Sequence, residues 1–112
     1  MPLINLRTSL TSVDDGDGLL QQLSSLLAEQ TGKPEAYVIA LLETGVCMTF
    51  AGSPEPCAYV EVKSIGALSP PAMTAAFCDL ISARTGIAAN RIYIGFEDVP
   101  ASCWGWNGST FG

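Results

Sequence analysis

A repeat with a spacing of 54 residues constrains this chain more than any other feature. Thr31 and Gly32 recur as Thr85 and Gly86, and Glu43 recurs as Glu97. In each half, a β-prone segment precedes a helical pattern, a glycine and a second apolar segment. Repeats of this kind build similar units that share one core. We therefore expect a single domain over residues 1–112, made of repeat units at about 1–56 and 57–112.

The first unit reads as strand, helix, strand. Residues 3–7 form a short β-prone segment, and an amphipathic pattern follows at Leu19, Leu20, Leu23, Leu26 and Leu27. These leucines fall on one helical face. An acidic cluster at residues 14–17 precedes them, and Gly32 follows, as is typical of helix ends. The apolar run at 37–42 has strand length and is typical of a central strand.

The second unit repeats this order. Residues 58–63 alternate between apolar and polar, Pro70 and Pro71 open a helical pattern that Gly86 ends, and residues 92–96 resemble a strand. Two β-α-β units predict an α+β fold with a four-stranded sheet and both helices on one face. We expect the other sheet face to be exposed, apolar and covered by oligomerisation. The tail at 105–112 contains two aromatic residues and is expected to pack against the domain.

Charge and composition exclude several classes of function. A net charge of −6 argues against nucleic-acid partners, which require a basic face. The absence of histidine excludes Ser-His-Asp and Cys-His catalytic sets and mixed Cys/His zinc sites. No run of apolar residues is long enough to span a membrane and no signal-peptide pattern opens the chain, so we expect no membrane partner and a cytoplasmic location.

Four cysteines remain, at positions 47, 57, 78 and 103. No two of them form a CxxC pair, because Val60 stands where the second cysteine would be. A chain that is 48% hydrophobic can build a core without disulfides, so we expect free, buried thiols in a reducing compartment.

Without histidine, a base that works near neutral pH must be a shifted side chain or a chain terminus. Removal of Met1 would leave Pro2 as a secondary amine, whose pKa apolar neighbours would lower. Lys33 is either a cation that complements the helix dipole or a clamp for an anionic substrate. Tyr37 and Tyr93 lie on equivalent or nearly equivalent predicted strands, and either could belong to the core or to a pocket.

Several blocks, taken together, resemble the macrophage migration inhibitory factor family of the tautomerase superfamily, in which D-dopachrome tautomerase is the sister. They are the Met-Pro start, Thr31-Gly32-Lys33-Pro34, the segment 52–58, Ser64-Ile65-Gly66, the segment 91–94 and the tail 105–111. They cover essentially the whole chain in the family's order. The resemblance implies a homotrimer whose sheets line the inside of a ring.

The resemblance also implies a cofactor-free, metal-free keto-enol tautomerase that acts on small enolisable carboxylates such as phenylpyruvate. Pro2 would be the catalytic base and acid. The implied substrate contacts are Lys33, Ser64, Ile65 and Tyr93, with Tyr93 supplied by the neighbouring subunit. The implied pocket wall comprises Tyr37, Trp104, Trp106 and Phe111.

This chain departs from the vertebrate cytokine of the family at three places. Val60 removes the CxxC motif and with it the basis for thiol-disulfide activity. Gly95 replaces an asparagine that makes a polar pocket contact, and Trp104 replaces a small aliphatic residue and could narrow the pocket. Two other functions therefore remain open: a cytokine-like interaction protein that binds a protein receptor and keeps a vestigial pocket, and a small-molecule-binding regulator.

Overall fold

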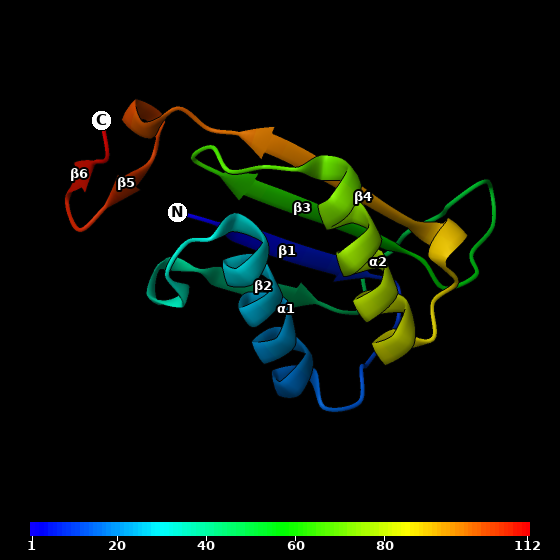
Figure 1. The fold of residues 1–112 in the computed structure, drawn as a ribbon. Coiled ribbons are helices and arrows are strands. Elements are labelled where there is room, and N and C mark those ends of the chain that lie inside the picture. Colours follow the sequence, from blue (N-terminus) through cyan, green and yellow to red (C-terminus); the bar gives the residue numbers. More distant parts are fainter.

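The structure, a computed structural model, describes residues 1–112 and contains two long helices and a four-stranded sheet (Figure 1). The strands of the sheet are β1 (Leu3–Thr8), β2 (Ile39–Glu43), β3 (Ala58–Ser64) and β4 (Ile92–Asp98), and the helices are α1 (Gly16–Thr31) and α2 (Pro70–Thr85). Short 3₁₀ helices span Glu35–Tyr37, Ala89–Arg91 and Ala101–Cys103, and the tail forms the hairpin β5 (Gly105–Trp106) and β6 (Ser109–Thr110). The predicted α+β fold is confirmed.

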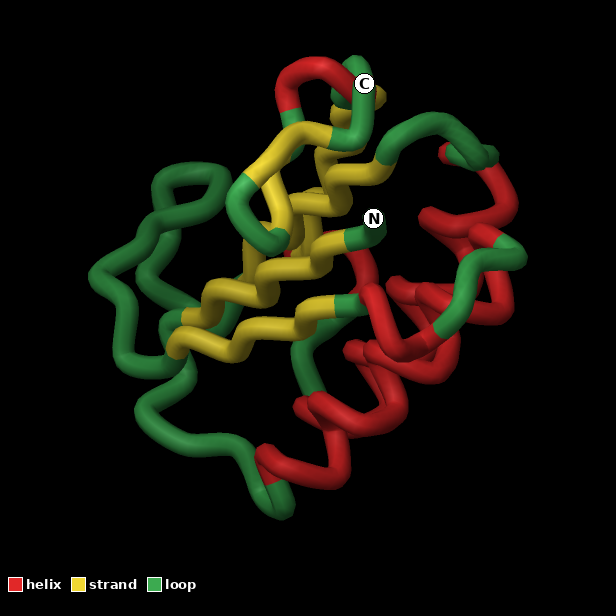
Figure 2. The backbone as a smooth tube through the Cα atoms, turned by 90° about the vertical axis from the view of Figure 1, so that its left-hand side faces the viewer, coloured by secondary structure: helices red, strands yellow, loops and turns green.

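The order of strands in the sheet is β2-β1-β3-β4. β1 pairs parallel with β2 and β3 pairs parallel with β4, while β1 and β3 meet antiparallel at the centre. Each parallel pair is one β-α-β unit, and both helices cover the same face of the sheet (Figures 1 and 2). The repeat is visible in the elements themselves, since α2 begins and ends 54 residues after α1.

The helix ends follow the sequence signals. Asp15 caps α1, and its carboxylate accepts a hydrogen bond from the Gly18 backbone amide. Gly32 and Gly86 end the two helices in the left-handed conformation that glycine adopts without steric cost. Pro70 and Pro71 occupy the first turn of α2, where a backbone N–H donor is not needed.

The core lies between the helices and the sheet. Its buried apolar side chains come from β1, β3 and β4, from both helices and from the loop after α2: Ile4, Leu6, Leu19, Leu23, Leu27, Ala58, Val60, Val62, Met73, Phe77, Ile81, Ile87 and Ile92. Alternate residues of β3 point into this core, so Ala58, Val60, Val62 and Ser64 are all buried.

The opposite sheet face, which we call the open face, differs from the prediction. We expected an apolar surface, but β3 presents Tyr59, Glu61 and Lys63 there, and salt bridges join Arg7 to Glu43 and Lys63 to Glu97. The prediction therefore holds only in part, because Ile39, Leu41 and Tyr93 are exposed apolar residues on the outward positions of β2 and β4. In β3, period-2 alternation sends the apolar residues toward the helices and leaves the polar ones outside, which the overall apolar content of the strands does not show.

The position of β2 was also predicted wrongly. Its apolar run suggested a central strand, yet β2 is an edge strand, and Ile39 and Leu41 remain 52% and 36% exposed. Tyr37 lies in the preceding 3₁₀ helix rather than in the strand. By the 54-residue offset its counterpart is Arg91, also in a 3₁₀ helix, so Tyr37 and Tyr93 are not equivalent.

The cysteines are all free, as expected, but only Cys57 is buried. Cys78 is partly buried. Cys47 and Cys103 are exposed, because Cys47 lies in the loop after β2 and Cys103 ends a short 3₁₀ helix, both outside the core. Neither long helix has the length and apolar content needed to cross a membrane.

Candidate functional site

The N-terminus lies at one end of the sheet beside the tail hairpin (Figures 1 and 2). A cavity of about 230 Å³ opens there, and all the residues that line it are hydrophobic: Met1, Ala36, Tyr37, Val38, Ile39, Trp104, Trp106 and Phe111. Pro2 is buried directly behind Met1, and its carbonyl accepts a hydrogen bond from the Ile39 backbone amide at 3.2 Å. This hydrogen bond fixes Pro2 next to Ile39, one of the residues that line the cavity.

The electrostatics of this end favour a neutral amine. Burial lowers the pKa of the Met1 amino group below its ordinary value, and the nearby positive charge of Lys33 lowers that pKa further. Both effects disfavour the protonated form. Removal of Met1 would move the amine one residue inward, from partly buried Met1 to buried Pro2.

Lys33 is held at this site by the loop after β3. It directly follows Gly32, the residue that ends α1, and its Nζ donates a hydrogen bond to the Ile65 carbonyl at 2.8 Å. The structure thus brings together two of the predicted substrate contacts, Lys33 and Ile65. With one of its three ammonium donors on Ile65, Lys33 retains donors for an incoming carboxylate.

Ser64, the other predicted contact in this segment, ends β3. Its side chain is fully buried on the helix-facing side, and its hydroxyl has no hydrogen-bond partner. The Ser64 carbonyl accepts a hydrogen bond from the Val99 backbone amide at 2.9 Å. This anchors the segment that carries Ile65.

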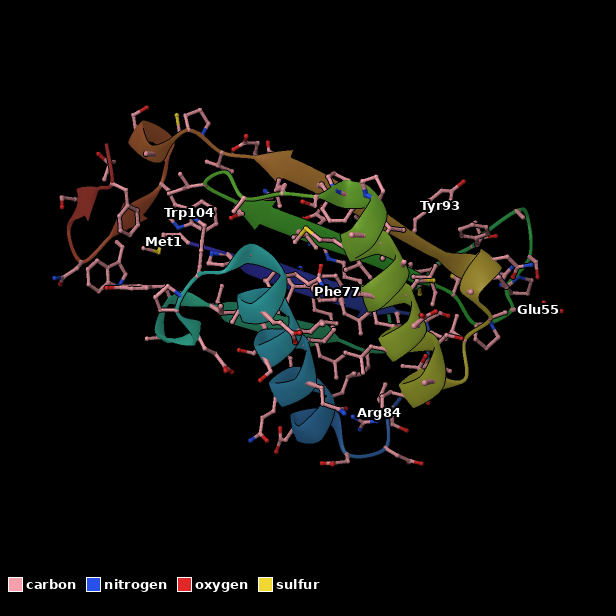
Figure 3. All side chains as sticks on the ribbon, in the orientation of Figure 1. Met1, Glu55, Phe77, Arg84, Tyr93 and Trp104 are labelled. Carbon is pink, nitrogen blue, oxygen red and sulfur yellow. The ribbon has the colours of Figure 1, made fainter.

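The four aromatic residues predicted for the pocket wall line one cavity. Tyr37 meets Trp106 edge-on with ring centroids 5.7 Å apart, and Trp106 stacks on Phe111 at 6.0 Å. Trp104 lines the same cavity, so this larger side chain does border the pocket. Figure 3 shows Met1 and Trp104 together at this end. The tail is therefore docked, as predicted, through its aromatic residues.

Tyr93 lies elsewhere. It stands near the start of β4, 66% exposed on the open face, at the end of the sheet opposite Met1 (Figure 3). Its cross-strand neighbour is Tyr59, four residues before Lys63 along β3, and four residues of strand span about 13 Å. Within one chain, the structure does not bring Tyr93 to the Pro2 pocket.

Gly95 lies two residues further along β4 and pairs with Glu61. A Cβ atom at this position would lie 3.5 Å from the Tyr59 hydroxyl. A hollow of about 330 Å³ on the open face is lined here by Tyr59, Glu61, Val62, Lys63, Gly95, Phe96 and Glu97. The missing asparagine therefore leaves space that the Tyr59 phenol partly fills.

Sequence reasoning missed two groups of residues near these sites. Ala36, Val38 and Ile39 line the N-terminal cavity, and the only signal for them was their position after Lys33-Pro34. Arg91 and Phe50 lie beside Tyr93, and Arg91 could have been noticed as one of only five basic residues in the chain.

Comparison with known proteins identifies a family. The family model described as "Macrophage migration inhibitory factor (MIF)" matches residues 1–112. A macrophage migration inhibitory factor of Xenopus laevis is 38% identical over 114 residues, covering 99% of both chains.

Solved structures agree with this match. The macrophage migration inhibitory factor homologue from Prochlorococcus marinus is 57% identical, with a TM-score of 0.94 and coverage of 98% of this chain and 99% of that one. The Trichinella spiralis protein is 31% identical, with a TM-score of 0.92 over 97% of this chain and 99% of that one.

Proposed function

Because the chain belongs to the macrophage migration inhibitory factor family, we propose that it is a cofactor-independent keto-enol tautomerase for small enolisable carboxylates such as phenylpyruvate. Family membership supports a role of the tautomerase-superfamily or cytokine-like type. The observation that carries the enzymatic proposal is the N-terminal cavity, where a desolvated amine, a lysine and an aromatic wall meet.

In this proposal the Pro2 amine, freed by removal of Met1, is both base and acid. It takes a proton from the carbon next to the carbonyl, which leaves an enolate, and the resulting ammonium returns that proton to the enolate oxygen. This step forms the enol product and returns the amine to its neutral state. A base is most effective when its pKa is near the working pH. Burial and Lys33 lower the pKa of the Met1 amino group, and we expect the same two effects on the Pro2 amine once Met1 is removed.

Lys33 binds the substrate carboxylate through the ammonium donors that Ile65 leaves free. The aromatic wall of Tyr37, Trp106 and Phe111 receives the substrate ring and excludes water. A nearby ammonium also stabilises the negative charge that develops on the enolate.

The proposal includes a ring of three copies, because Tyr93 reaches a Pro2 pocket only from a neighbouring chain. The exposed edge strand β2 and the exposed Tyr93 offer surfaces for such an assembly. Sedimentation of a stable particle of three times 11.7 kDa is expected, and a stable monomer at micromolar concentration would exclude the ring.

The decisive experiment measures phenylpyruvate turnover with protein whose N-terminus is verified by mass. We expect Pro2→Gly to lower turnover by at least about tenfold, the low end of general-base effects when a substitute amine remains. Protein that retains Met1 should be inactive, because its Pro2 nitrogen is an amide. Equal turnover with and without Met1 would remove Pro2 from the mechanism and leave the cytokine-like role as the better reading.

A further inference from the structure

Arg91 fastens the long loop between β2 and β3 to the start of β4. This loop, residues 44–57, is called the 44–57 loop below. The Arg91 guanidinium donates hydrogen bonds to four of its backbone carbonyls: Pro56 at 2.9 Å, Phe50 at 3.2 Å, Ser53 at 3.2 Å and Glu55 at 2.8 Å. Neither ion pair of the structure involves Arg91. Its donors are used on the loop instead.

The part of the loop that Arg91 holds is a tight turn. Phe50 and Ser53 exchange backbone hydrogen bonds at 3.1 and 3.0 Å, and the two residues between them, Ala51 and Gly52, both have positive φ. Glycine adopts such angles freely, but for alanine they are strained. Arg91 binds the carbonyls at both ends of this turn, so it stabilises a conformation that the turn's own sequence disfavours.

This turn also supports Tyr93. The Phe50 ring packs against the Tyr93 ring in a T-shaped contact with centroids 4.7 Å apart, and the Arg91 guanidinium lies 5.3 Å from the centre of the Phe50 ring. Tyr59, the cross-strand neighbour of Tyr93, lines the same hollow as these two rings. Because Tyr93 is 66% exposed, the edge-on contact with Phe50 is a main restraint on its ring from the 44–57 loop. Figure 3 shows Tyr93 beside this end of the loop.

From these contacts we infer that Arg91 is a positioning residue for substrate binding: it holds Phe50 against Tyr93 and thereby fixes the tyrosine that one subunit presents to its neighbour's pocket. The inference rests on the proposed function, because it assigns Tyr93 to a substrate pocket. Arg91 itself touches no substrate in this scheme. Its effect passes through Phe50.

The role requires arginine rather than a positive charge alone. A guanidinium presents five N–H donors in a planar fork, and Arg91 directs them to carbonyls on both sides of the turn. A lysine ammonium carries three donors around one nitrogen and cannot span the same four carbonyls. Arg91→Lys therefore keeps the charge and removes the grip on the loop.

The experiment compares Arg91→Lys and Phe50→Leu with the wild-type protein, using phenylpyruvate and verified N-termini. We expect each substitution to raise KM about fivefold, within the range by which residues beyond the ligand modulate a binding site, and to change kcat by less than about twofold. Arg84→Lys is the matched control. Arg84 also donates to backbone carbonyls, those of Asp14 and Asp15, but at the distant contact between the helices, so its KM should stay unchanged.

A second comparison separates positioning from general loss of structure. In a Tyr93→Ala background the Arg91→Lys substitution should add nothing to KM, because the group it positions is gone. An unchanged KM in Arg91→Lys, a lower kcat at unchanged KM, or an equal rise in KM with and without Tyr93 would each overturn the inference.

A readout independent of turnover distinguishes this inference from the proposed function. The three tyrosines can be replaced by 3-fluorotyrosine, with the Tyr93 signal identified by its loss in Tyr93→Phe. We expect that fluorine signal to move in Arg91→Lys and to stay in place in Arg84→Lys. If processed wild-type protein turns over no keto acid, the proposed function fails. The fluorine signal then decides alone whether Arg91 positions Tyr93, and an unmoved signal contradicts it.

Discussion

Ser64→Ala should make the protein more stable. The Ser64 side chain is 0% exposed and its hydroxyl has no hydrogen-bond partner. An unpartnered buried hydroxyl costs about 1–3 kcal/mol in mutational data. Alanine removes the hydroxyl and leaves a gap of only one oxygen atom, which offsets a part of that gain. We expect the free energy of unfolding to rise by about 1 kcal/mol.

Thermal unfolding at matched protein concentration provides the assay. With an unfolding entropy of about 2.1 cal/mol/K per residue, a chain of 112 residues gives about 0.24 kcal/mol per kelvin, so the expected rise in Tm is about 4 °C. Ser82→Ala is the matched control. The Ser82 hydroxyl donates to the Ile87 carbonyl at 2.7 Å, so its removal should lower the free energy of unfolding by about 1 kcal/mol.

A loss of stability in Ser64→Ala as large as that in Ser82→Ala would refute the reasoning, since it would mean that the Ser64 hydroxyl has a partner in the folded protein. The same variant also tests the predicted role of Ser64 in substrate binding. A hydroxyl kept unpartnered for a ligand should give a higher KM together with a higher Tm when it is removed, the usual exchange between stability and function.

Other substitutions test the site and the loop. Lys33→Ala should raise KM for phenylpyruvate. Lys33→Ala should also raise the pKa of the terminal amine, because the positive charge of Lys33 lowers that pKa. The acidic limb of the pH–rate profile should therefore shift to higher pH, and an unshifted limb would contradict this. Ala51→Gly should raise the free energy of unfolding by about 0.5 kcal/mol in a denaturant titration, because relief of the positive φ exceeds the added entropy of the unfolded chain, whereas Ala51→Val should lower it by more than about 1 kcal/mol. Asp15→Ala should lower it by about 1 kcal/mol through loss of the cap on α1, and equal stability would mean that the Gly18 amide has another acceptor.

The elements of this fold could be predicted because their signals are local. The leucine spacing of α1, the glycines after both helices and the alternation of β3 each arise from a few neighbouring residues, and all match the structure. The edge position of β2 could not be predicted, because an apolar run reports burial on two faces without saying which molecule covers them. In the single chain one face of β2 is uncovered, and Ile39 on that face remains exposed.

The candidate site divides in the same way. Lys33 contacts Ile65 and the aromatic residues line one cavity within a single chain, whereas their predicted roles in substrate binding stay predictions. The hydrogen bonds from Arg91 to the 44–57 loop could not be predicted, because their four acceptors are backbone carbonyls, which every residue type carries. A contact between a side chain and a peptide group is visible only after the chain is folded.

The separation of Pro2 and Tyr93 at opposite ends of the sheet has a genetic consequence. In the proposed ring each pocket draws its amine from one copy and its tyrosine from the next, so two defective chains can complement each other. A Pro2→Gly chain still supplies the tyrosine, and a chain altered at Tyr93 still supplies the amine. Random assembly of equal amounts would reunite intact partners in about one pocket in four. A mixture of the two impaired proteins, unfolded and refolded together, would then be more active than either protein alone.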